Sequence, residues 1–131
     1  MAVEVKSGSS KAAAAAASLR TYMVQQSCPA GMFVTPEEIL FFRNLYTGYQ
    51  PETIQQIGSC RTTELLKTIP GGAISEPALI EVVEQWLETL DTHVNHAWPP
   101  SAREAIESCV VPAVIEGVVR TTGRRLRRTG S

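Results

Sequence analysis

SEPALIEVVEQWLETL, residues 75–90, is the stretch that decides the predicted fold. Ser75 is a favourable N-cap, and Pro77 suits the first turn of a helix. The apolar residues that follow recur at helical spacing and would form one face, namely Leu79, Ile80, Val83, Trp86, Leu87 and Leu90. Glutamates fill much of the opposite face. The stretch predicts an amphipathic helix whose apolar face must be buried against other elements.

Two longer helices are predicted before this stretch. Residues 11–26 include a run of alanines and have the highest helix propensity in the chain. Thr35, Pro36 and Glu38 form a capping-box pattern, which predicts a second helix that ends at Gly48. Because alanine lets backbones approach closely, the alanine run could pack against a neighbouring helix or subunit, or it could face water.

Shorter helices are predicted on either side of residues 75–90. One begins at Pro51 and one near Thr62, with Gly58 between them. A last helix begins at the capping box Ser101-Ala102-Arg103-Glu104 and is kinked or restarted at Pro112, which has no N–H to donate.

The composition fits one soluble globular domain. The chain has 131 residues, of which 44% are hydrophobic and 19% charged. Alternating apolar and polar residues are scarce, so we expect an all-α protein, a compact bundle of about five or six helices with a kinked C-terminal helix and a basic tail. Its predicted parts are a flexible N-terminal segment (1–9), a single domain (10–119) with a candidate hinge at 70–72, and an arginine-rich tail (120–131).

Charge is unevenly distributed along the chain, although the net charge is only −1. Residues 1–75 hold six bases and five acids, residues 76–118 hold one base and eight acids, and residues 119–131 hold five arginines. Guanidinium groups bind phosphate oxygens with two parallel hydrogen bonds. The tail therefore predicts binding of nucleic acid through Arg120, Arg124, Arg125, Arg127 and Arg128. Two alternatives remain open, in which the arginines pair with the protein's own acidic helix or form a solvated tail.

Catalytic and metal-binding patterns are weak. His93 and His96 lie three residues apart near Asp91, but this set is too small for a closed metal site. Gly71-Gly72 lacks the lysine and the spacing of a phosphate-binding loop, and nothing in the sequence brings a cysteine to a histidine. We therefore predict no enzyme activity, no catalytic residues, no metal and no cofactor.

Compartment and membrane association can also be judged from the sequence. The three cysteines are widely spaced and odd in number, which favours an intracellular reducing compartment, or a virion if the protein is viral. No apolar segment approaches the roughly 20 residues that cross a bilayer, so no membrane partner is expected.

The predicted function combines these features. We expect a self-associating helical structural protein that binds nucleic acid, RNA rather than DNA, without reading base sequence, in the manner of a small viral coat or nucleocapsid subunit. The alternative is a helical protein–protein interaction module, an effector or regulatory adaptor, with Val114, Ile115, Val118 and Val119 as its docking face.

Overall fold

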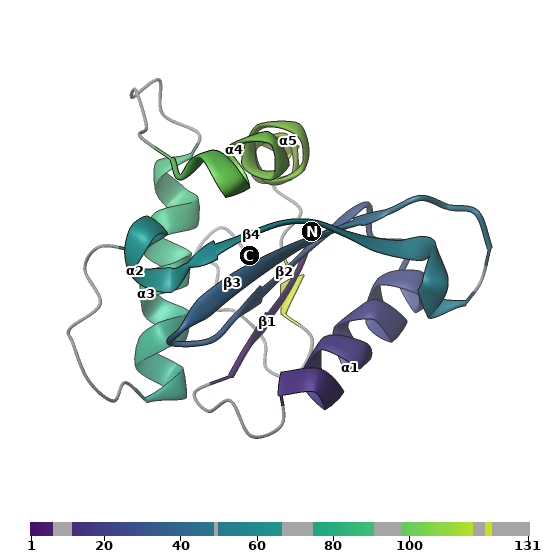
Figure 1. Cartoon of the computed structure of the whole chain (residues 1–131), viewed down its shortest axis with the longest axis horizontal. Helices are drawn as coiled ribbons and strands as arrows, with labels where there is room; N and C mark the ends of the chain where they lie inside the picture. The colour runs from purple at the N-terminus through teal and green to yellow at the C-terminus, as the bar shows by residue number, and fades with distance from the viewer. Residues whose placement is uncertain (7–11, 49, 67–74, 91–97, 117–119, 122–131) are drawn as a thin grey trace.

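The centre of the molecule is a β-sheet with helices on both faces (Figure 1). The structure is a computed structural model, and it describes residues 1–6, 12–48, 50–66, 75–90, 98–116 and 120–121. Four strands and a fifth of two residues form a mixed sheet in the order β4-β3-β2-β1-β5. The predicted all-α bundle is therefore wrong, and the fold is α/β.

The strand directions divide the sheet into a parallel and an antiparallel part. Strand β1 (Ala2–Val5) leads through helix α1 (Ala12–Gln25) to β2 (Ala30–Val34), which pairs with β1 in parallel. Strands β3 (Glu38–Asn44) and β4 (Ile54–Arg61) follow as antiparallel neighbours. Strand β5 (Arg120–Thr121) pairs in parallel with the other edge of β1. Strand β1 therefore lies between two parallel partners.

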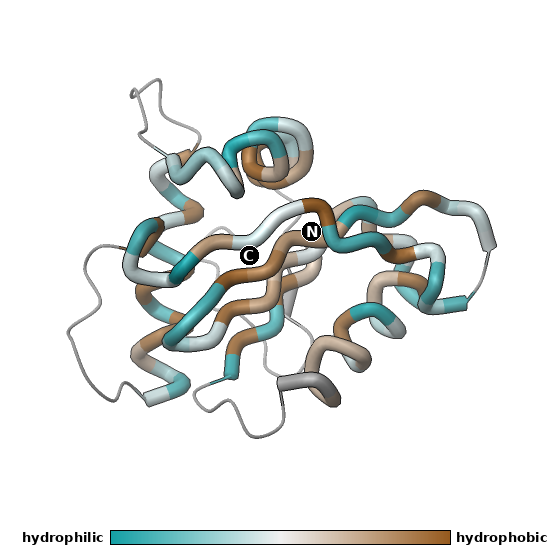
Figure 2. Tube along the Cα trace, viewed as in Figure 1, coloured by the Kyte–Doolittle hydropathy of each residue, from teal (hydrophilic) through white to brown (hydrophobic). Residues whose placement is uncertain are grey.

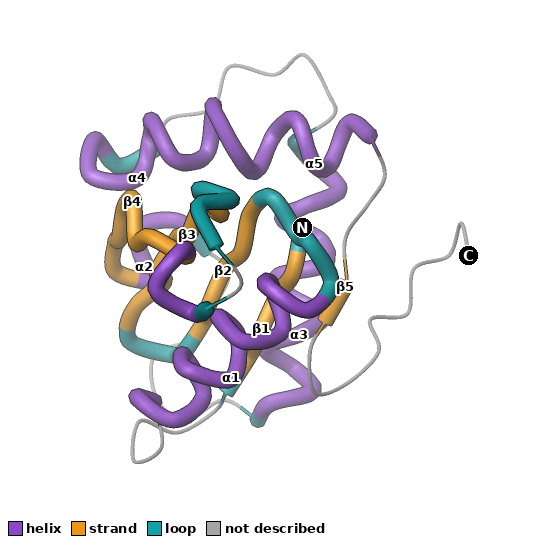
Figure 3. Tube along the Cα trace, turned by 90° about the vertical axis from the view of Figure 1, so that its right-hand side faces the viewer, coloured by secondary structure: helices purple, strands orange, loops and turns teal. Residues whose placement is uncertain are grey.

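Each face of the sheet has its own hydrophobic core. Helix α1 covers one face, where Leu19 and Met23 pack with Phe33 and Phe42. The remaining helices cover the other face, as the rotated view in Figure 3 shows. That larger core includes Val3, Met32, Ile39, Phe41, Leu87 and Ile106.

Burial on both faces explains why strands β2 and β3 resemble helix or loop in the sequence. Ile39 and Phe41 point to the larger core, and Phe42 points to the α1 side. A strand covered on both faces is apolar at successive positions and loses the alternation of a half-exposed strand. Figure 2 shows this as nearly continuous apolar colour along the middle strands.

The predicted capping box at Thr35 is a turn between β2 and β3. The Thr35 hydroxyl accepts hydrogen bonds from the backbone N–H groups of Glu37 (3.3 Å) and Glu38 (3.1 Å). The Thr35 N–H donates to the Glu38 carbonyl at 3.0 Å, which closes the turn. The predicted helix over 35–48 is therefore wrong, because the same local bonds serve a strand-to-strand turn. Tyr46, near the end of that predicted helix, is 58% exposed.

Strand β4 occupies the place of the two predicted short helices. The 3-10 helix η1 (Pro51–Thr53) precedes it, and the single-turn helix α2 (Thr62–Leu65) follows it. The predicted helix starts at Pro51 and Thr62 thus coincide with real helical turns, but Gly58 lies within the strand that joins them.

The remaining helices lie near their predicted positions. Helix α3 (Glu76–Thr89) begins at Ser75, whose hydroxyl accepts a hydrogen bond from the Ala78 N–H at 3.3 Å. Helices α4 (Pro100–Ala105) and α5 (Val111–Glu116) are joined by a π-helical turn (Ile106–Val110). Pro112 is the second residue of α5 and so comes just after this wider turn. A regular α-helix through the preceding turn is disfavoured, because the proline ring would clash with the carbonyl group four residues earlier and Pro112 has no N–H to donate to it.

Two of the predicted chain segments, 1–9 and 120–131, contain strands. Residues 2–5, expected in a flexible segment, form β1 and are buried. Residues 120 and 121 of the arginine-rich tail form β5. The candidate hinge at 70–72 and residues 122–131 lie outside the described residues.

Candidate functional site at the carboxyl end of strand β1

Glu4 is a buried carboxylate near the end of β1. Glu4 is only 6% exposed, and its neighbours Val3 and Val5, which point to the opposite face of the sheet, belong to the larger core. Burial raises the pKa of Glu4 above its ordinary value of 4.5. The charge of Glu76 acts in the same direction, although more weakly. A buried acid with a perturbed pKa is a common feature of functional sites.

Lys6 lies beside Glu4 and is its ion-pair partner. The Lys6 Nζ is 3.6 Å from the Glu4 Oε2, and the Lys6 side chain is 42% exposed. The nearby positive charge of Lys6 lowers the pKa of Glu4, which partly offsets the effect of burial. The pair therefore joins a buried acid to a base that reaches solvent.

The position of this pair in the sheet matches the usual place of ligand sites in α/β folds. Ligands of open parallel sheets bind outside the carboxyl ends of strands, where neighbouring connections lead to opposite faces. The connection that leaves the carboxyl end of β1 leads to α1 on one face, and the residues that follow β5 lie outside the described part of the chain. Glu4 stands one residue beyond Val3, which pairs with Thr121 of β5. Strand β5 thus ends beside Val3, one residue before Glu4, and Figures 1 and 3 show β5 running alongside β1.

The arginines predicted to bind nucleic acid are only partly described. Arg120 belongs to β5. Arg124, Arg125, Arg127 and Arg128 lie outside the described residues, so the structure neither pairs them with the acidic helix nor separates them from it. In the sequence, two residues separate Thr121, the last residue of β5, from the first of these four arginines.

Other candidate chemistry has little support in the described part of the chain. His93 and His96 lie outside it, and no three metal-binding side chains come together within it. All three cysteines are free thiols, of which Cys28 and Cys60 are buried and Cys109 is half-buried. Burial, and to a lesser extent the charge of Glu64, raise the pKa of Cys60 to about 11. Cys60 is therefore protonated at neutral pH and a poor nucleophile.

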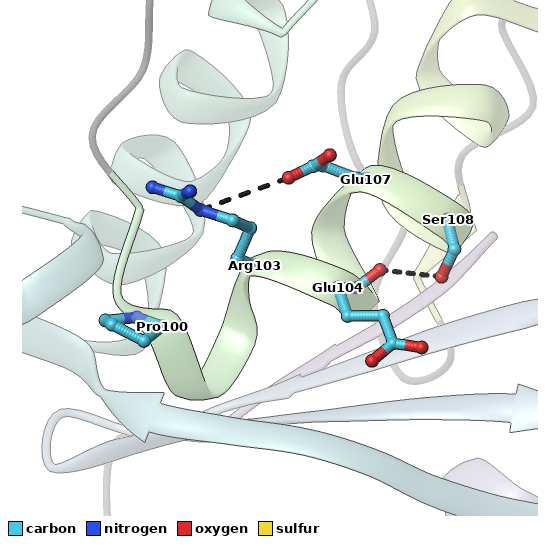
Figure 4. A pocket seen from close by; sticks show the side chains of 5 residues that line it. All are labelled: Pro100, Arg103, Glu104, Glu107 and Ser108. Atoms are coloured by element: carbon cyan, nitrogen blue, oxygen red, sulfur yellow. Dashed lines mark hydrogen bonds and ion pairs between the residues drawn. The ribbon is translucent and has the colours of Figure 1, made fainter.

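A shallow hollow over helix α4 and the π-helical turn is shown in Figure 4. Several of its polar groups already have partners within the helix. The Ser108 hydroxyl donates to the Glu104 carbonyl at 2.7 Å, and the Arg103 Nε lies 4.0 Å from the Glu107 Oε1. Because this surface is open and its one cationic side chain is paired with a carboxylate, it is a weaker candidate than the β1 edge.

Neither Glu4 nor Lys6 stands out in the sequence, because the segment before Ala12 resembles a flexible start. One signal could have found them. Glu4 is enclosed by apolar residues in Ala2-Val3-Glu4-Val5, and a spacing of two places Glu4 and Lys6 on one face of a strand.

Comparison with known proteins finds no significant similarity to this chain among family models, curated proteins or solved structures. Within the described residues, no helix combines the length and apolarity that a membrane span needs.

Proposed function

We propose that the chain binds nucleic acid through its phosphates, RNA in the first place, at the edge of the sheet where β1 and β5 end. The observation that carries this proposal is the parallel pairing of β5 with β1, in which Thr121 lies opposite Val3. In the sequence, the arginine-rich residues 122–131 follow Thr121, and Val3, the partner of Thr121, directly precedes Glu4. A cationic segment at a strand's carboxyl end is a suitable arrangement for phosphate groups.

Salt dependence is the direct test of this binding. A fluorescein-labelled 20-nucleotide RNA of mixed sequence is titrated with protein at several NaCl concentrations, and anisotropy gives Kd. If five phosphates are neutralised, the logarithm of the association constant falls with the logarithm of salt concentration at a slope of about −3.5 on this single-stranded RNA. The same titration with DNA of the same sequence shows whether the sugar affects Kd, and titration with a second RNA shows whether the base sequence does.

Variants locate the binding surface. Replacing Arg124, Arg125, Arg127 and Arg128 with alanine should weaken binding and flatten the slope. The control replaces Arg61 and Arg103, which lie on β4 and α4, and should leave the slope nearly unchanged. A flat salt response, or undiminished binding by the fourfold variant, contradicts the proposal.

Self-association, as in a coat or nucleocapsid subunit, stays a prediction. One reason for this prediction is that the alanine run could form a face that packs against a neighbouring subunit. Ala15 is instead buried in the α1 core of its own molecule, although Ala14 and Ala17 are exposed. Light scattering during size-exclusion chromatography tests the prediction. A monomer that ignores nucleic acid would favour the adaptor alternative.

The Glu4–Lys6 pair favours a second candidate function at the same edge, phosphodiester hydrolysis with Mg²⁺. Magnesium in enzymes is commonly held by one or two carboxylates together with substrate phosphate oxygens. Glu4 would supply such a carboxylate. In hydrolysis, the oxygen of a water molecule bonds to phosphorus, the bond to the leaving oxygen breaks, and that oxygen takes up a proton. The partly exposed ammonium of Lys6 could stabilise the growing negative charge.

The absence of enzyme activity stays a prediction, and this second candidate function, which differs from it, has its own test. Labelled RNA and DNA are incubated with protein and MgCl₂, and products are separated on a gel. Cleavage that needs Mg²⁺ and falls at least a hundredfold in both Glu4→Gln and Lys6→Met supports hydrolysis. Glu104→Gln, an exposed change on α4, is the control. Equal cleavage by all four proteins would assign the activity to a contaminant and remove this candidate without affecting the binding proposal.

A further inference from the structure

A second cavity lies at the opposite end of the sheet from Glu4. Its volume is about 340 Å³, which falls at the lower end of the range of ligand pockets, about 300 to 1,000 Å³. The start of β2 and the end of β3 form one side, and the π-helical turn and α5 form the other. The walls therefore belong to elements far apart in the sequence.

The lining is mostly apolar. Met1, Ala30 and Ala113 are buried, and Pro112 adds a rigid ring. The wall that contains Cys109 is π-helical, a backbone form that occurs frequently at functional sites. The cavity is thus suited to an apolar body of small size.

Arg43 brings a cationic side chain to this cavity. It pairs with Ala30 in the sheet, and both residues line the cavity. Among the described residues, no acidic side chain lies within ion-pair distance of the Arg43 guanidinium. The neighbouring Asn44 is held in place, because its side-chain oxygen accepts a hydrogen bond from the Tyr46 N–H at 2.8 Å. The β3 end is therefore ordered beside an arginine that has no carboxylate partner in the described part of the chain.

We propose that this cavity binds a small carboxylate with an apolar body, whose two oxygens are held by Arg43. A guanidinium group matches a carboxylate with two parallel hydrogen bonds. A single cation balances one negative charge, whereas the doubly charged head of a phosphate monoester would bring a second charge to an apolar site. This site is separate from the nucleic-acid edge and does not depend on the function proposed there.

Phenylacetate is the probe for this site, with phenylacetamide as the neutral analogue and phenyl phosphate as the dianion. Binding is measured by calorimetry and by the rate at which iodoacetamide alkylates Cys109. Bound phenylacetate should slow that alkylation, because Cys109 lines the cavity. The buried Cys60, whose pKa is raised to about 11, should stay unreactive in all samples.

Two variants and one control decide the outcome. Arg43→Gln should weaken phenylacetate binding about tenfold or more, because a charged hydrogen bond is lost, and should leave phenylacetamide binding unchanged. Ala113→Phe should fill the cavity and abolish protection of Cys109. Arg103→Gln, an arginine outside the cavity, should bind as the parent does.

The contradicting results are equally specific. Absence of saturable phenylacetate binding below about 10 mM overturns the proposal, since it would fall short of even weak millimolar affinity. Equal weakening by Arg43→Gln and Arg103→Gln would show a general charge effect and also overturns it. Tighter binding of phenyl phosphate than of phenylacetate would refute the carboxylate preference.

Discussion

Glu4 is a residue at which stability and function should conflict. Its carboxylate is buried and its pKa is raised, so the native state holds the proton more tightly than the unfolded chain does. Stability then falls as the pH rises from the ordinary pKa of 4.5 through the higher native pKa, and the cost is complete above it. A charged acid at this position lowers the free energy of unfolding, a cost that a strand with an uncharged residue there would not have.

Glu4→Gln should therefore stabilise the protein at pH 7. The gain should disappear near pH 4, where the parent's Glu4 is protonated too. Urea unfolding at both pH values measures the difference. Glu104→Gln is the matched control on an exposed site and should change stability little at either pH. A destabilised Glu4→Gln variant at pH 7 would mean that the ion pair with Lys6 outweighs burial.

At the scale of elements, two glycines allow helices to approach the sheet. A Cβ at Gly31 would overlap the sulfur of Met23, which is fully buried in α1. A Cβ at Gly58 would lie 3.1 Å from the Ser101 carbonyl oxygen of α4. These contacts fix the distances from α1 to β2 and from α4 to β4.

Gly31→Ala and Gly58→Ala should each cost about 1–3 kcal/mol, as expected when a packed interior receives an extra methyl group. Gly48→Ala is the control, because no atom lies within 4 Å of its added Cβ. Its effect should stay within about 0.5 kcal/mol. Thermal unfolding followed by circular dichroism gives all three values. Equal stability of the three variants would show that the glycines do not limit helix approach.

The burial of α3 sets another expectation at this scale. Leu87 is fully buried, whereas Trp86 is half-buried at the edge of the same core. Leu87→Ala should cost about 2–5 kcal/mol because it leaves a cavity. Trp86→Ala should cost less than a fully buried tryptophan would, and Glu88→Ala on the exposed face should be nearly neutral. An equal effect of the Leu87 and Glu88 changes in urea unfolding would contradict this orientation of α3.

Helices could be predicted from this sequence far better than strands. Helix α3 has a good cap at Ser75 and one apolar face, and both signals are local. The β2–β3 pair has neither, since Phe41 and Phe42 are buried on opposite faces and erase the two-residue period. The sequence can place Glu4 and Lys6 on one face of a strand, but it cannot predict the burial of Glu4, which depends on strands and helices that lie far away in the chain.

At the scale of the whole molecule, the two cores share one sheet. Leu19 packs on the α1 side and Leu87 on the other. Leu19→Ala and Leu87→Ala should each destabilise the protein, and their effects should add to within about 0.5 kcal/mol because the sheet separates them. A single urea transition should remain. Two separate transitions would show that the faces unfold independently.

The place of β1 has a consequence for how the chain is made. Strand β1 comes long before its partner β5 in the chain, and the other elements of the sheet lie between them. Until residues 120 and 121 emerge from the ribosome, one side of this buried strand has no neighbour, and unpaired strand edges invite contact with other chains. The nascent chain thus carries an open β1 edge for as long as the intervening residues are being synthesised.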